Sequence, residues 1–73
     1  MKDFNDKRQF VSLLMKQAGW VGYGTKKPLA KKLGIYEKSL IMALNGYRET
    51  PRSYQILEMV ETFLMDKGNW ING

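Results

Sequence analysis

The chain opens with an amphipathic pattern that predicts a helix over residues 6–18. Apolar residues fall at i, i+3, i+4 and i+8, which is the spacing of one helix face. They are Phe10, Leu13, Leu14 and Ala18, with Val11 and Met15 widening the stripe. Asn5 or Asp6 can cap the start of this helix, and Gly19 can end it. We expect the stripe to pack against the rest of the chain.

Two shorter helices are predicted in the middle of the chain, over residues 26–33 and 37–45. Thr25 is the candidate N-cap of the first, and Gly34 ends it because glycine tolerates the left-handed conformation of a helix stop. Asn45–Gly46 supplies the same kind of stop for the second. The residues that should face inward on this second helix share one side of it: Leu40, Ala43 and Leu44.

The last helix has the clearest signals and is predicted over residues 51–65. Thr50 is its N-cap and Pro51 its first residue, where a missing N–H costs little. Its apolar residues form a broad stripe that we assign to the core: Ile56, Leu57, Met59, Val60, Phe63 and Leu64. We expect Gly68 to end this helix.

Large apolar residues also lie in the segments that show no helical period. Trp20 and Val21 belong to a glycine-rich loop, and we expect both to tuck under the bundle. Trp70 and Ile71 lie in a short tail, residues 66–73. Because such side chains are poorly accommodated in water, we expect the tail either to fold back on its own chain or to bury against a second copy.

Together these elements predict one all-α domain over residues 1–73, a compact bundle of four or five short helices. Ala30 must be small because the helix over 37–45 crosses close to it. Gly34 must adopt a positive φ in a three-residue turn between the two short helices. Leu40 then holds the second of them to the core. This spacing is typical of a helix-turn-helix, here over residues 25–46.

The segment from Thr25 to Gly46 resembles the helix-turn-helix of the lambdoid phage repressor and Cro family, also called XRE-type regulators. The resemblance is carried by the run Leu-Ala-Lys-Lys-Leu-Gly-Ile that starts at Leu29 and by the Asn45–Gly46 exit, and it extends to about Leu64. The chain departs from the family at three positions. Lys26 stands where Gln is frequent, Tyr36 where Ser or Thr caps the second helix, and Glu37 where Gln or Arg is frequent.

The resemblance implies a lambda-repressor-like fold in which the helix beginning at Glu37 enters the major groove of duplex DNA. The residues expected to face base edges are Tyr36, Glu37, Lys38, Ile41, Met42 and Asn45. The residues expected at phosphates are Thr25, Lys26, Lys27, Tyr47 and Arg48. Ile41 and Met42 would touch thymine methyls, or alternatively bury against a dimer partner or a neighbouring helix.

Charge supports a polyanionic partner. The formal net charge is +5, and the part from Lys16 to Arg52 holds eight basic residues against two acidic ones. From Ser53 onward there is one lysine against three acidic residues. A basic zone beside an acidic end suits nucleic acid, although a merely solvated surface would give the same composition.

Composition argues against several other classes. The chain has no Cys and no His, which removes the commonest metal ligands and the commonest general base. We therefore expect no enzyme, no metal site and no cofactor, and no small-molecule effector is evident. No apolar run approaches the ~20 residues that span a bilayer, and the N-terminus lacks a signal-peptide pattern. We expect a cytoplasmic protein without membrane contact.

The function expected from these features is sequence-specific double-stranded DNA binding by a transcriptional regulator, and specifically a phage or prophage repressor. The alternative is a protein–protein interaction module on the same fold, such as an antitoxin or a phage inhibitor of a host factor. Glu37, Ile41 and Met42 favour this alternative slightly, because they are unusual on a DNA-reading surface. We also expect a homodimer, formed through the last helix and the tail.

Overall fold

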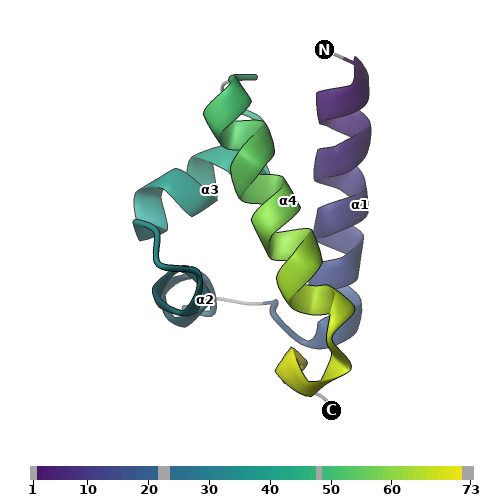
Figure 1. Ribbon diagram of the computed structural model, residues 1–73, viewed down its shortest axis with the longest axis vertical. Coiled ribbons are helices and arrows are strands. Elements are labelled where there is room, and N and C mark those ends of the chain that lie inside the picture. The colour runs from purple at the N-terminus through teal and green to yellow at the C-terminus, as the bar shows by residue number, and fades with distance from the viewer. Residues whose placement is uncertain (1, 22–23, 48, 72–73) are drawn as a thin grey trace.

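The computed structural model describes residues 2–21, 24–47 and 49–71; in this part of the chain all regular secondary structure is helical and no strand occurs (Figure 1). The elements are α1 (Lys2–Ala18), α2 (Lys26–Leu33), α3 (Glu37–Asn45), α4 (Pro51–Met65) and a single 3₁₀ turn, η1 (Lys67–Asn69). The all-α expectation is thus confirmed, and α2, α3 and α4 have the predicted bounds.

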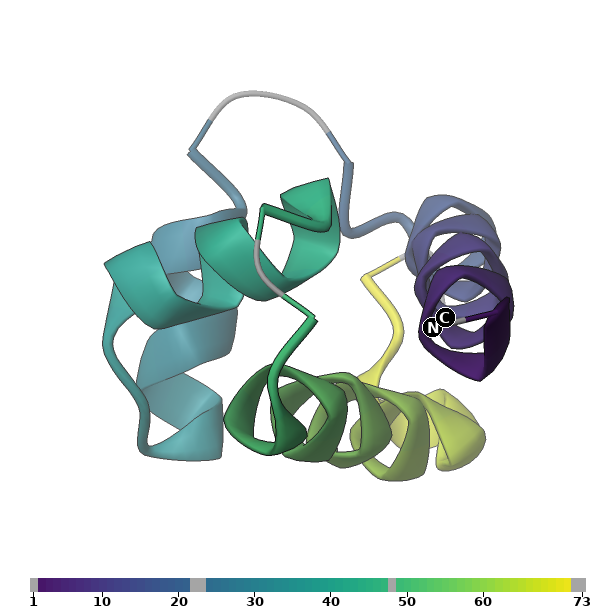
Figure 2. The same cartoon turned by 90° about the horizontal axis from the view of Figure 1, so that it is seen from above.

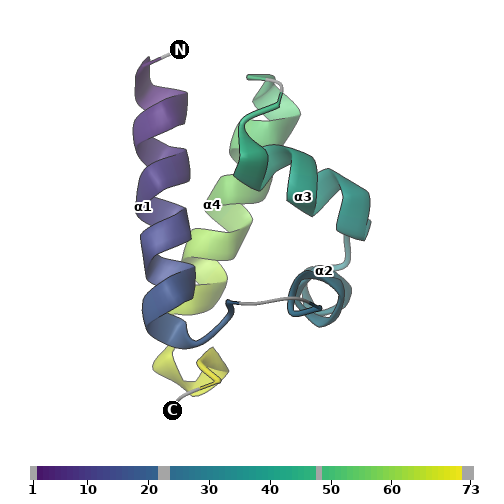
Figure 3. The same cartoon turned by 180° about the vertical axis from the view of Figure 1, so that it is seen from behind.

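The four helices form one bundle around α4. Helices α1 and α4 lie side by side and run in the same direction (Figures 1 and 3). Helix α4 also packs against α3 and, less extensively, against α2. Seen from above, α3 lies between α2 and α1, and its C-terminal end reaches toward α1, which it also contacts (Figure 2). In Figure 3, α3 is seen from the side and α2 nearly end-on, so the axes of these two helices make a wide angle.

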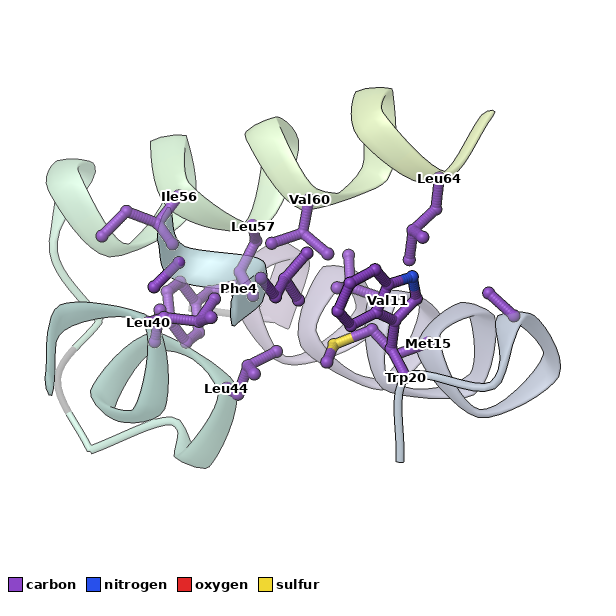
Figure 4. Packing of buried hydrophobic residues seen from close by; sticks show 14 residues of the cluster. Phe4, Val11, Met15, Trp20, Leu40, Leu44, Ile56, Leu57, Val60 and Leu64 are labelled. Atoms are coloured by element: carbon purple, nitrogen blue, oxygen red, sulfur yellow. The ribbon is translucent and has the colours of Figure 1, made fainter. Parts of the chain in front are cut away.

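All four helices contribute to a single hydrophobic core. Phe4 lies with Leu40 and Leu57 at one end, while Trp20 lies with Met15 at the other (Figure 4). The ring of Trp20 also meets Phe63 edge-on, with 6.2 Å between the ring centroids. The prediction that Trp20 tucks under the bundle is therefore confirmed, whereas Val21 is 49% exposed and that part of the prediction is wrong.

Helix α1 differs from the prediction in its start and in its buried face. It begins at Lys2, so Asn5 and Asp6 lie within it rather than capping it. Phe10 and Leu13 are 48% and 55% exposed. The face that is buried in the core consists of Phe4, Val11, Met15 and Ala18. Helix α1 has two apolar stripes, and the longer one, which includes Phe4, packs into the core. Because Phe4 is buried there, the helix extends to residues before the predicted start.

The helix ends follow local chemistry at most positions. Thr50 caps α4, since its Oγ1 accepts a hydrogen bond from the backbone N–H of Ser53 at 3.1 Å. Gly34 and Gly46 end α2 and α3 with φ angles of +74° and +67°, the left-handed conformation expected at both. Thr25 occupies the N-cap position of α2, but its side chain makes no capping hydrogen bond, contrary to prediction.

The tail folds back on its own chain. Helix α4 ends at Met65 as predicted, but the residue that stops it is Asp66 and not Gly68: the backbone leaves the helical conformation at Asp66, whose side chain accepts from the N–H of Gly68 at 2.9 Å. The indole Nε1 of Trp70 donates to the carbonyl of Leu64 at 2.8 Å. Such bonds satisfy carbonyls that a helix end leaves without partners. None of the described helices combines the length and apolar character needed to cross a membrane.

Candidate nucleic-acid interface

The outer side of α3 gathers most of the residues expected at base edges. Leu40, Ala43 and Leu44 are buried and fix the inward side of this helix. At 3.6 residues per turn, positions 38, 41, 42 and 45 then turn outward, because residues three and four apart share a face. Lys38 and Asn45 are exposed accordingly. The structure therefore brings Lys38 and Asn45 onto one exposed side of α3.

The two apolar members of that surface are half-buried by the protein itself. Met42 lines a shallow hollow of about 190 Å³ against the beginning of α4. The other residues that line this hollow are Ser39, Thr50, Arg52, Ser53 and Ile56. Neither Ile41 nor Met42 is fully covered, so each still presents part of its side chain outward.

Both ends of α3 carry exposed aromatic side chains. Tyr36, the N-cap residue, is 84% exposed and its side chain makes no capping hydrogen bond. Glu37 follows in the first turn and is exposed as well. Beyond Gly46, Tyr47 is 72% exposed. Arg48, expected at a phosphate, lies outside the described residues.

Helix α2 contributes a concentration of positive charge next to α3. Four of its eight residues are lysines and none is acidic. Lys31 and Lys32 lie in the last turn, where a cation is stabilised by the negative end of the helix dipole. Lys26 and Lys27 lie in the first turn, where the dipole disfavours a cation. An anion bound at this end would offset that cost.

The lysine-rich start of α2 and the end of α3 meet at one hollow. Lys26 and Asn45 both line it, and its volume is about 230 Å³. The remaining lining residues are Ser12, Met15, Trp20, Val21 and Leu44. Thr25, directly before Lys26, is half-buried, and Lys27 is exposed. One residue expected at phosphates and one expected at bases thus share a single depression, although 19 positions separate them in the sequence.

The sequence interpretation missed one basic residue beside this surface. Arg52 is exposed in the first turn of α4, lines the same hollow as Met42 and binds the side-chain oxygen of Gln55 at 3.0 Å. The sequence did contain a signal for this residue: Arg52 follows the predicted N-cap Thr50, and so lies in the first turn of the helix after α3. Over the described residues, no group of three or more metal-ligating side chains is present.

Comparison with known proteins yields no match: no protein family, no curated protein and no solved structure matches this chain. Any functional assignment therefore rests on the residues and on the geometry of the chain itself.

Proposed function

We propose that this protein binds duplex DNA sequence-specifically, as a helix-turn-helix regulator with α3 as its reading helix. One observation carries the proposal: Lys38 and Asn45 are exposed on the outer side of α3, and the lysine-rich start of α2 lies beside its C-terminal end. A helix fits the major groove of B-DNA, and cations beside it are needed to hold the phosphates.

The connection between α2 and α3 supports this proposal. Three residues, Gly34 to Tyr36, join the helices, and Gly34 has the positive φ that such a turn needs. The N–H of Ile35 returns to the carbonyl of Ala30 at 3.0 Å and tightens the turn. Ala30 is buried at 2% exposure, which allows α3 to pack closely over it. These are the features expected of a helix-turn-helix.

The proposed roles follow from side-chain chemistry. Lys38 can donate to O6 and N7 of guanine, and Asn45 to an adenine or a phosphate. Glu37 is compatible with a base edge where it accepts from the N4 amino group of cytosine. The phosphate contacts are assigned to residues that flank α3: Thr25, Lys26, Lys27, Tyr47 and Arg48.

Repression is the form of regulation that this chain fits best. A repressor needs only to occupy its operator, and a DNA-binding bundle of this kind is sufficient for that. We therefore propose a repressor of the phage or prophage kind, in line with the family resemblance between Thr25 and Gly46.

A protein-binding role is the second candidate, and the exposed tyrosines favour it. Tyr36 and Tyr47 are 84% and 72% exposed at the two ends of α3, and Met42 is only half-covered. Tyrosine and methionine are enriched in protein interfaces, whereas Glu37 disfavours contact with phosphates. The same surface would then bind a protein.

Salt dependence of binding separates the two candidates. Duplexes selected from a random pool would be titrated with the protein at 50–300 mM salt, with fluorescence anisotropy as the signal. If the chain and a symmetry mate supply about six phosphate contacts, log K should fall with log salt at a slope of about −5. A slope indistinguishable from zero, or no duplex enriched by the selection, would overturn the DNA-binding proposal.

A further inference from the structure

Helix α1 carries a second apolar stripe that the described part of the chain leaves about half exposed. Phe10 and Leu13 are 48% and 55% exposed, while the opposite face of the helix is buried in the core. Asp6 and Gln17 extend this line and are exposed too. Steps of four, three and four residues connect these positions, which is the spacing of a seam between two packed helices.

Charge along this stripe changes sign from one end to the other. Asp3 and Asp6 lie at its N-terminal end, and both are exposed. Lys16 is exposed beside its C-terminal end. The apolar pair Phe10 and Leu13 lies between them. A stripe that is acidic, then apolar, then flanked by a cation is complementary to itself only when two copies run in opposite directions.

We propose that a second copy of this chain packs antiparallel along the outer stripe of α1. Phe10 of each copy then contacts Leu13 of the partner, and Asp6 of each lies near Lys16 and Gln17 of the partner. A parallel pair would instead set each Asp6 against its own counterpart, which is repulsive. The dipoles of the two helices also favour the antiparallel arrangement.

The tail supplies less apolar surface for a dimer than the sequence suggests. The Trp70 indole is half-buried and donates to Leu64 within its own chain. Ile71 is bonded through its backbone N–H to the carbonyl of Ala18 at 2.8 Å, and its side chain, 53% exposed, is the one that the tail still presents. The main side chain of the expected tail interface is therefore already engaged. This leaves the stripe on α1 as the stronger candidate for self-association.

The proposed contact is small and compatible with DNA binding. A seam between two helices of this length falls below the ~1,200 Å² of a standard interface, so we expect a dissociation constant in the micromolar range. Arg8 and Ser12 are the α1 residues that face the end of α3, and at 3.6 residues per turn Phe10 and Leu13 lie on the other side of the helix. The dimer therefore leaves both α3 surfaces uncovered. Self-association can be measured without DNA, and the inference does not depend on the proposed function.

Sedimentation of the full chain tests the surface. The wild-type protein should show concentration-dependent dimerisation, and the double variant Phe10→Gln, Leu13→Gln should weaken it about tenfold or more. Val21→Gln is the matched control, because Val21 is similarly exposed, at 49%, but lies outside the stripe. Circular dichroism confirms that each variant keeps its helices. A wild-type chain that remains monomeric at about 1 mM would overturn the proposal and assign the stripe to another partner.

Engineered cysteines test the direction of packing, and the natural chain has none to interfere. The double variant Asp6→Cys, Gln17→Cys should form a disulfide-linked dimer on mild oxidation, because these positions oppose each other in an antiparallel seam. Asp6→Cys alone should not cross-link at the same concentration. Cross-linking of the single variant with equal yield would indicate parallel or non-specific association and would overturn the proposal.

Charge reversal provides a third test that leaves the apolar pair intact. Asp6→Lys should weaken dimerisation about threefold, which is the range of an exposed charge pair, and Lys16→Asp should do the same. The double variant should recover the wild-type dissociation constant, because each reversed residue again lies near an opposite charge of the partner. Additive weakening in the double variant would contradict the antiparallel pairing.

Discussion

The indole Nε1 of Trp20 donates a hydrogen bond to the backbone carbonyl of Asn69, with 2.8 Å between the two atoms. Trp20 directly follows the turn that ends α1, and Asn69 closes the 3₁₀ turn after α4, so this bond joins the segments that follow α1 and α4 at the same end of the bundle. The side-chain Nδ2 of Asn69 donates in turn to the carbonyl of Phe63 at 2.8 Å. The loop after α1 and the tail therefore stabilise each other.

Trp20→Phe should lower the free energy of unfolding by about 1–3 kcal/mol. The phenyl ring retains part of the buried area but cannot donate, so the carbonyl of Asn69 loses its partner in a partly buried setting. Urea denaturation followed by circular dichroism measures the change. Val21→Ala, in the exposed neighbouring position, should stay within about 0.5 kcal/mol of wild type. Equal effects of the two substitutions would show that the bond contributes nothing.

Gly34→Ala should destabilise the protein by about 1–2 kcal/mol through backbone strain alone. Gly34 has a φ of +74°, and a Cβ placed there would meet no atom within 4 Å, so steric crowding does not contribute. Gly34→Asn should cost less, because asparagine tolerates this conformation better than alanine does. Thermal unfolding of both variants tests the order. Asparagine costing as much as alanine would indicate a different cause.

Gly46→Ala should cost slightly more than Gly34→Ala, because the Arg8 side chain must move aside in addition to the backbone strain. Gly46 has a φ of +67°, and its Cβ would lie 3.0 Å from the Cδ and Nε atoms of Arg8. In a protein that already contains Arg8→Ala, the crowding is absent. Adding Gly46→Ala to that variant should therefore lower its free energy of unfolding only by the contribution of backbone strain. A double-mutant cycle in urea gives both values. An additive cycle would rule out the contact.

The ion pair between α1 and α4 should make stability sensitive to alkaline pH. Lys7 Nζ lies 2.9 Å from Glu61 Oε1. The hydrogen bond to Glu61 and the nearby negative charge raise the pKa of Lys7 above its ordinary value of 10.5. A raised pKa in the folded state adds stability below the unfolded value, and this contribution is lost as pH rises through the folded value.

Glu61→Gln removes the ion pair and should therefore cost at most about 1 kcal/mol at pH 7, as expected for a partly exposed pair. The difference between wild type and this variant should shrink as pH rises well above 10.5, where Lys7 loses its proton. Chemical denaturation at pH 7, 9 and 11 tests this. A difference that grows between pH 9 and pH 11 would have the wrong sign for the proposed cause.

Two lysines on the candidate interface should separate specificity from general affinity. Lys38→Ala should relax sequence preference, because losing a good base contact costs about 1–3 kcal/mol of discrimination. Lys27→Ala should weaken binding to selected and random duplexes alike, as expected for a phosphate contact. Competition titrations with both kinds of duplex measure this. Identical behaviour of the two variants would refute the assignment of roles.

Local chemistry in the sequence determined the bounds of three helices. Thr50 and Pro51 start α4, and Gly34 and Gly46 end α2 and α3, because capping and left-handed stops depend on residues within one turn. The helical period also determined that Lys38 and Asn45 turn outward once Leu40 turns inward. These features follow from neighbours in the sequence, and a single sequence therefore contains them.

How much of the candidate interface is covered depends on contacts between helices, and these cannot be predicted from the sequence pattern of α3 alone. Ile41 and Met42 lie at the edge of the outward face, where the period alone does not separate burial from exposure. Met42 is half-buried because it lies against the beginning of α4, where Thr50 and Ser53 line the same hollow. The meeting of Lys26 with Asn45 likewise depends on how the helices cross.

The buried face of α1 and the path of the tail were decided only by the tertiary structure. Helix α1 has two apolar stripes, and its own period does not indicate which one enters the core. Packing against α3 and α4 selects the stripe with Phe4 and leaves Phe10 and Leu13 outside. Trp70 similarly has no local signal, since its partner is the carbonyl of Leu64, which is available only because α4 ends one residue later, at Met65. Which apolar side chains enter the core depends on the arrangement of all helices that packs most completely, and a pattern within one helix does not contain that information.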